Sequence, residues 1–362
     1  MSPKALSDEL AGQRAAYTGE RPSQVRPAMD QALCLLSSEA QGAIVDVLRA
    51  TAKEGVEATD VPRLHDSIRR ILFPEAVSRS QQELEVKLFI ATAEARDHLI
   101  VRPPASLMRP TFAVSSIEPG VQSASVHLDR YGLGPLLMGL LPQAGQYQVD
   151  GVAGLRYRQR RRHVELLLLE TQPQARIVLP GIDKGDWASA IRFVEQSHEG
   201  ECRWLWNGEY RAELSPDERE RLNSYRRVYG PAHLGSSLFR RHRILAGAMG
   251  FSTRGEWKNQ WKLDWIGGPS TGEVGARLSH PIFGLPGAWD LRYVRDKTAV
   301  LHERISDQRL ARGHQPHEIY LFRQPPYTKD NEAQEHWYRS GWIAWKAWES
   351  EEERRQGRSL RH

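Results

Sequence analysis

The chain has 362 residues, of which 40% are hydrophobic and 26% are charged, and its 50 Lys and Arg exceed its 45 Asp and Glu for a net charge of +5. This composition excludes disordered, collagen-like and disulfide-scaffold proteins, and the length suffices for two or three domains with cores of their own. Cys34 and Cys202 are too few for a disulfide framework. No apolar run approaches the ~20 residues of a membrane span, and no apolar leader segment is visible, so we expect a cytoplasmic protein that contacts no membrane.

The first third of the chain predicts a helical domain. Residues 1–28 are polar and are expected to form a flexible tail. Beyond them, apolar residues recur at three- and four-residue spacing, which is typical of helices that bury one face. The expected helices are 29–53, 60–72 and 80–96. They predict a three-helix domain over residues 29–101, and the proline-containing segment 102–110 predicts a linker.

Beyond the linker the hydrophobic period changes to two, which predicts an α+β domain over residues 111–245 with a basic strand and a hairpin. The expected regular elements are strands at 121–128, 154–169 and 175–179 and a short helix at 186–196. The hairpin is predicted at 202–214, because Asn207-Gly208 favours a tight type I′ turn. Ser215 and Glu218 then have the spacing of a capping box, which predicts the start of another helix.

Residues 246–362 predict a C-terminal α+β region with tryptophan-rich helices. Trp257, Trp261 and Trp265 follow one another at four-residue spacing, which favours one face of a helix. The remaining expected elements are a short helix at 270–278, an antiparallel meander of strands at 289–294, 298–305 and 317–322, and a terminal helix at 331–354. The predicted fold class is therefore α+β, an N-terminal three-helix domain followed by mixed antiparallel α+β domains rich in Arg and Trp.

Two arginine clusters with interleaved aromatic residues are the candidate nucleic-acid-binding residues. The first lies in the expected strand 154–169, where alternate residues share a face, and consists of Arg156, Arg158, Arg160 and Arg162. The second follows the capping-box helix and consists of Arg226, Arg227, Arg240, Arg241 and Arg243. Arrays of guanidinium groups of this kind can follow a nucleic-acid backbone. The alternative interpretation is the solvated outer face of a half-buried sheet.

Enzyme signatures are few. The chain has no phosphate-binding glycine loop, nucleophile elbow or paired zinc motif. His314, His317 and Glu318 have side chains that bind metals, but Pro316 prevents a shared helical face, so no metal or cofactor is expected. Carboxylates that suit Mg²⁺ occur at expected strand ends without the rest of a nuclease signature, namely Asp150, Glu165, Glu170, Asp264 and Asp290.

We therefore expect a nucleic-acid-binding or scaffolding protein that acts through clustered arginines and aromatic residues, with nucleic acid or another polyanion as its partner. The first alternative is an enzyme, a metal-dependent phosphodiesterase or nuclease, which the length and mixed architecture allow. The second is a protein–protein adaptor that binds its partner through the tryptophan-rich C-terminal helix. Whether the chain is catalytic stays open at this point.

Overall fold

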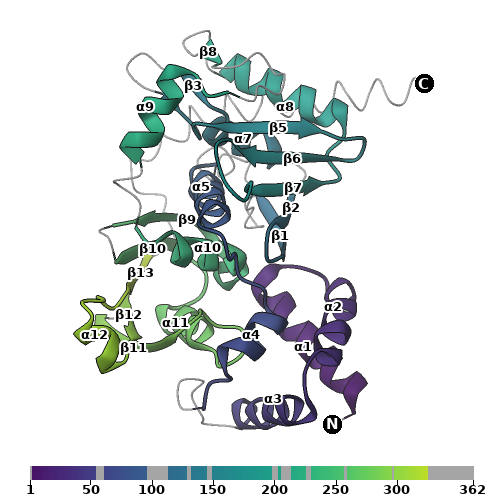
Figure 1. Ribbon diagram of the computed structural model, residues 1–362, viewed down its shortest axis with the longest axis vertical. Coiled ribbons are helices and arrows are strands. Elements are labelled where there is room, and N and C mark those ends of the chain that lie inside the picture. The colour runs from purple at the N-terminus through teal and green to yellow at the C-terminus, as the bar shows by residue number, and fades with distance from the viewer. Residues whose placement is uncertain are drawn as a thin grey trace.

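The fold is α+β, as predicted: two five-stranded sheets are held together by helices, and further helices cover one end of the molecule (Figure 1). In this computed structural model we describe residues 2–53, 61–95, 113–128, 132–144, 149–197, 203–204, 213–225, 230–256, 259–295 and 297–324. Within these segments no helix is long and apolar enough to cross a membrane. The predicted linker 102–110 and terminal helix 331–354 lie outside them.

Five helices come first in the chain: α1 (Pro3–Thr18), α2 (Pro22–Cys34), α3 (Ser38–Thr51), α4 (Asp66–Leu72) and α5 (Arg79–Glu94). The predicted flexible tail is wrong, because α1 is capped by Ser2 and buries Leu6, Leu10 and Tyr17. The predicted helix 29–53 is instead two helices, since the Ser37 side chain caps a new helix. Gly19 ends α1 with a φ of 77°, and a Cβ there would meet the Ser115 carbonyl oxygen at 2.4 Å.

The first sheet has the order β1-β2-β7-β6-β5. Its strands are β1 (Val114–Pro119), β2 (Ala124–Leu128), β5 (Leu155–Gln159), β6 (His163–Leu168) and β7 (Arg176–Pro180). The predicted strands near β2 and β7 are confirmed, but the single strand 154–169 is wrong. It is a hairpin, and the Arg160 N–H donates to the His163 carbonyl across its turn. This turn contains neither glycine nor asparagine, so the usual hairpin signal is missing.

Several shorter elements surround this sheet: α7 (Leu133–Leu140), α8 (Lys184–Ser197), α9 (Pro216–Tyr225) and a small sheet of β3 (Gln143–Ala144), β4 (Val149–Asp150) and β8 (Arg203–Trp204). Helix α8 confirms the helix predicted at 186–196. Helix α9 confirms the predicted capping box, because Ser215 Oγ accepts from the Glu218 N–H and Glu218 accepts from the Ser215 N–H. The turn of the predicted hairpin 202–214 lies outside the described residues.

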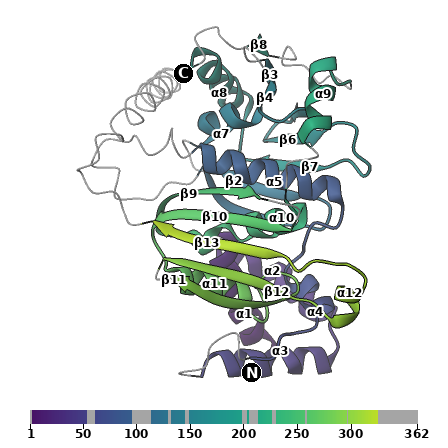
Figure 2. The same ribbon diagram turned by 90° about the vertical axis from the view of Figure 1, so that its left-hand side faces the viewer.

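The second sheet has the order β11-β12-β13-β10-β9, with β13 parallel to β10 (Figure 2). Its strands are β9 (Ala248–Gly255), β10 (Gln260–Gly267), β11 (Ala288–Arg295), β12 (Thr298–Arg304) and β13 (Glu318–Gln324). The helices nearby are α10 (Ala232–Arg240), η2 (His242–Leu245), α11 (Thr271–Ser279) and α12 (Asp307–Ala311). The predicted meander and the short helix at 270–278 are confirmed. The predicted tryptophan helix is wrong, because Trp261 and Trp265 lie in strand β10.

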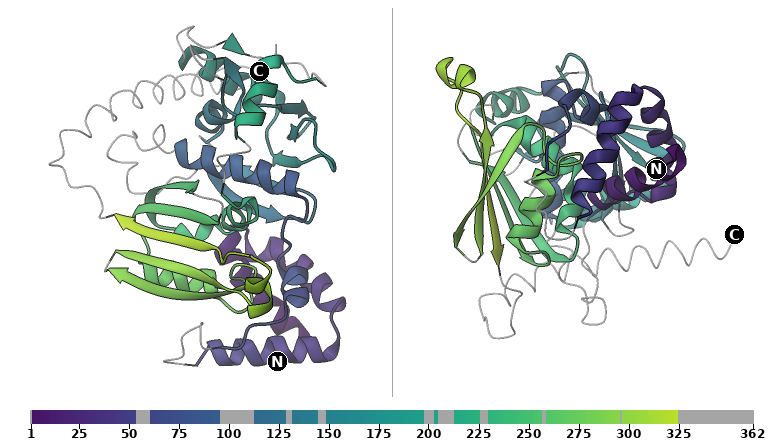
Figure 3. Two further views of the ribbon diagram at one scale, coloured as in Figure 1. Left: turned by 60° about the vertical axis from the view of Figure 1, so that its left-hand side comes forward. Right: turned by 90° about the horizontal axis from the view of Figure 1, so that it is seen from below.

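Helix α5 lies between the two sheets (Figure 3) and packs against α7, α10 and β9. The ring of Phe89 contacts the rings of Phe239 and Phe251, with centroids 5.9 and 5.3 Å apart. Buried apolar side chains form a continuous cluster that extends from α1 to β13. The division of the chain into domains stays a prediction, but buried apolar residues from both sides of the proposed linker belong to this one cluster.

Candidate functional site

The structure separates the nine candidate arginines into groups with different environments. Three are buried in ion pairs, namely Arg156, Arg240 and Arg241. Three reach the surface, namely Arg158, Arg160 and Arg162. Arg243 is half-buried, and Arg226 and Arg227 lie outside the described residues. The two predicted clusters therefore do not form one exposed array.

Arg156 shares a sheet face with Arg158, as the strand period predicts, but α9 begins over it. Its guanidinium donates to both carboxylate oxygens of Glu218, at 2.8 and 2.9 Å, and to the Glu213 carbonyl oxygen. Glu218 also accepts from the backbone N–H of Gly154. Burial acts to raise the pKa of Glu218, but the hydrogen bonds from Arg156 and the backbone lower it. This pair fastens α9 to the sheet.

Arg240 and Arg241 join α10 to the segments around α5. Arg240 binds Glu85 through Nε and Nη2, at 2.8 and 2.6 Å, and both side chains are fully buried. Arg241 binds Glu75 and also donates to the carbonyl oxygens of Phe283 and Gly284. Both guanidinium groups are bound by internal partners, so they do not present charge to a ligand.

The surface arginines form a basic hairpin, which we define as Arg158, Arg160, Arg161, Arg162, His163 and Arg176 on β5, β6, β7 and the turn. The Glu165 carboxylate lies among them, 3.9 Å from Arg158, 3.5 Å from Arg160 and 3.7 Å from both His163 and Arg176. Three arginines and a histidine thus share a single carboxylate, and the turn adds two more guanidinium groups. One carboxylate does not neutralise this many arginines, so the basic hairpin leaves an excess of positive charge at its end of the sheet.

The face of the first sheet that carries the basic hairpin is polar. The strand register places Glu165 beside Arg158 and Val178, and it places Ser125 next in the same row. The Tyr157 ring belongs to the opposite face, where it packs 4.5 Å from the Trp187 ring of α8. In Figure 1, β5, β6 and β7 lie in front of α7. Apart from α9 over Arg156, the described helices leave the hairpin end of this face open.

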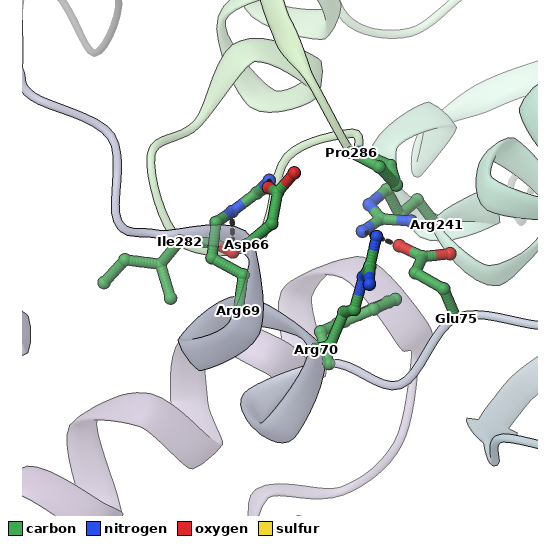
Figure 4. Close-up of a pocket in the computed structure, with 8 residues that line it drawn as sticks. Asp66, Arg69, Arg70, Glu75, Arg241, Ile282 and Pro286 are labelled. Carbon is green, nitrogen blue, oxygen red and sulfur yellow. Dashed lines mark hydrogen bonds and ion pairs between the residues drawn. The ribbon is translucent and has the colours of Figure 1, made fainter. Parts of the chain in front are cut away.

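A second polar region runs along α10, where His233, Ser237 and Arg241 follow at four-residue spacing. At the Arg241 end lies a small pocket (Figure 4). The pocket is lined by Asp66, Arg69, Arg70, Phe73, Glu75, Arg241, Ile282 and Pro286. Arg69 donates to the carbonyl oxygens of Ile282, Gly284 and Leu285, so it too is held by the protein itself.

At the other end of α10, two imidazoles and a carboxylate meet. His317 Nδ1 lies 2.5 Å from Glu303 Oε2, and Arg309 donates to Glu303 Oε1 at 3.2 Å. The rings of His233 and His317 have centroids 4.7 Å apart and planes at 79°. Partial burial acts to raise the pKa of Glu303, but His317 and Arg309 lower it to about 2. Glu303 is therefore ionised, and the proton of a neutral His317 belongs on Nδ1.

Sequence reasoning finds only part of this imidazole site. It identifies His317 as a metal-binding type of residue and groups it with His314 and Glu318, its neighbours in the chain. The residues that contact its ring, His233 and Glu303, come from α10 and β12. Glu303 lies on an expected strand next to a turn, which gives no sign of its partner. Over the described part of the chain, no group of three or more metal-binding side chains is assembled.

Comparisons with known proteins add no identity: no family model, no curated protein and no solved structure matches the chain.

Proposed function

We propose that this protein binds nucleic acid through the phosphate backbone, with the basic hairpin as the contact surface. The observation that carries the proposal is the concentration of five arginines at the open end of the first sheet, of which three share the Glu165 carboxylate. Clustered positive charge of this kind releases counterions from nucleic acid, which supplies affinity without base recognition.

The position of the arginines in the hairpin supports this function. Arg161 and Arg162 occupy the turn between β5 and β6, and both are exposed. A two-stranded ribbon with a tight turn is narrow enough to approach the groove of a duplex, where phosphates line both sides. Guanidinium groups pair with phosphate oxygens through two parallel hydrogen bonds, which favours arginine at such contacts.

The test is binding of labelled duplex DNA, single-stranded DNA and RNA by fluorescence anisotropy over a series of salt concentrations. The variant R160Q/R161Q/R162Q removes three charges at the turn. We expect weaker binding and a shallower dependence of log affinity on log salt, by up to about 0.9 for each duplex phosphate that the variant no longer neutralises. Thermal stability should change little, because exposed charges contribute about 0–1 kcal/mol each.

The matched control is R49Q/R292Q/R312Q, which removes the same charge from exposed positions far from the hairpin in the fold. It should retain most of the binding and the original salt slope. If the wild-type chain binds none of the three probes, or if the two triple variants are weakened equally, the basic hairpin is not a nucleic-acid-binding surface.

A further inference from the structure

We propose that His233 and His317 form a binding site for a divalent transition-metal ion of the kind that imidazole prefers, such as Cu²⁺ or Zn²⁺, with Glu303 supporting it from behind. This site is independent of the nucleic-acid binding proposed above. It lies where the first turn of α10 meets the start of β13, on residues that no sequence motif connects.

The geometry of the two rings fits a shared ion. Histidine nitrogens bind zinc at about 2.0–2.1 Å, so two imidazoles on one tetrahedral ion have ring centroids roughly 5 Å apart. The centroids of His233 and His317 are 4.7 Å apart. The centroid separation therefore matches that of two imidazoles on one ion. The ring planes meet at 79°, and binding requires the side chains to rotate until one nitrogen of each ring points at the ion.

The surroundings of His317 match those of a metal ligand. A ligating histidine usually donates its second ring N–H to a carboxylate, which orients the ring and makes the ligand nitrogen more basic. Glu303 takes this role at Nδ1 of His317 and leaves Nε2 for the ion. Arg309 donates to the other oxygen of the Glu303 carboxylate.

The site is accessible from solvent. His233 is exposed and the His317 side chain is 18% exposed, so an ion can enter from solvent. A neutral imidazole is the form that binds metal. Because two protein ligands leave positions for water, we expect binding in the micromolar range, tightest for Cu²⁺ and absent for Mg²⁺ and Ca²⁺.

The experiment uses the full chain with CuSO₄ and ZnSO₄ in a buffer free of chelators. Affinity is measured by calorimetry, and electron paramagnetic resonance with less than one equivalent of Cu²⁺ counts the nitrogen ligands. We expect one preferred ion per chain with two imidazole nitrogens. H233A should weaken this binding by at least tenfold and remove one nitrogen from the spectrum. E303Q should weaken it by about 10–100-fold, as for other residues that orient a ligand.

The control is H302A, which removes the neighbouring histidine of β12, whose side chain pairs with Glu318. Its affinity and spectrum should match those of the wild-type chain. The chain has 13 histidines, and some of them can bind Cu²⁺ weakly. Comparison of H233A with H302A distinguishes binding at the proposed site from such binding elsewhere. H233A truncates an exposed side chain, and its melting temperature checks that it folds. If wild-type binding is absent, or if H233A binds Cu²⁺ as tightly as the wild type or H302A, the assignment is overturned.

Discussion

The arginines of this protein show that one residue type serves two purposes in one chain. Arg156 and Arg240 are candidates for binding on sequence grounds because they lie in basic stretches. Each instead forms a two-pronged pair with a glutamate from another element, Glu218 or Glu85. Buried charge is tolerated only when it is paired and hydrogen-bonded. The sequence shows such arginines but not their partners, so it does not separate the buried arginines from the exposed ones.

The pair between Glu85 and Arg240 offers a test at the scale of single residues. E85Q keeps the shape of the side chain but leaves Arg240 as a buried, unpaired cation, and Ser236 loses a charged acceptor. We expect the free energy of unfolding to fall by about 3–5 kcal/mol, measured by urea denaturation. E83Q on the same helix breaks the exposed pair with Arg79 and should cost about 0–1 kcal/mol. Equal effects of the two variants would contradict a structural role for the buried pair.

At the scale of elements, the tryptophan spacing shows how a helix and a strand can share one pattern. Residues four apart lie on the same face of a helix, and they also lie on the same face of a strand because four is even. What separates the two is the residue halfway between. Leu263 lies between Trp261 and Trp265 and is buried with them, whereas Lys262 and Asp264 pair on the other face. The alternation was therefore readable in the sequence, and the four-residue spacing obscured it.

This difference predicts the effect of substitutions in β10. In a helix, residue 263 would lie opposite Trp261 and Trp265, and shortening it would matter little. In the strand it belongs to the core, so L263A should lower the free energy of unfolding by about 2–5 kcal/mol. K262A, on the opposite face, removes the ion pair with Asp264 and should lower it by less, about 1 kcal/mol. Denaturation curves of the two variants decide between the arrangements, and a tolerated L263A would argue against the strand.

Other elements differ in how much of their structure local sequence determines. Helices with capping boxes, such as α9 and α11, begin where Ser and Glu spacing predicts. The hairpin of β5 and β6 has no such local signal, because its turn consists of arginines and contains neither glycine nor asparagine. Helix α1 escapes prediction for another reason. Its apolar face is interrupted by Arg14, which is buried through a pair with Glu20 and packs with the apolar residues.

At the scale of the whole molecule, the long-range contacts are what the sequence could not supply. The fold class followed from local periodicity, because helices come first and strands dominate later. The packing of α5 between both sheets, and the meeting of His233 with His317, depend on residues distant in the chain. In the folded protein the basic hairpin and the imidazole site lie at separate locations.

Buried histidines predict how the stability of the whole molecule depends on pH. The ordinary pKa of a histidine is 6.5. Burial lowers the pKa of His242 to about 3 and that of His280, which is less deeply buried, to about 4. His280 Nδ1 accepts the backbone N–H groups of Ile282 and Phe283, which also requires an unprotonated nitrogen. The Glu118 hydrogen bond has the opposite effect on His127 and raises its pKa. That pair is strongest below pH 6.5, and its contribution is lost as the pH rises through the raised pKa.

The sign of the net effect on acidification follows from proton uptake. Below pH 6.5 the unfolded chain protonates His242 and His280, whereas the folded protein leaves both neutral until near their lowered pKa values, so the unfolded state binds more protons. The free energy of unfolding should therefore fall as pH decreases from 6.5 toward 5, at about 1.4 kcal/mol per pH unit for each histidine. H280N keeps a side-chain acceptor for the backbone N–H groups but does not titrate. Because the pKa of His233 is lowered as well as that of His242, two of three such histidines remain in this variant, and its slope should be about two thirds of the wild-type slope. Urea denaturation at pH 8, 7, 6 and 5 measures both slopes. A wild-type stability that is constant down to pH 5, or an H280N slope equal to the wild-type slope, would show that these imidazoles are protonated in the folded protein.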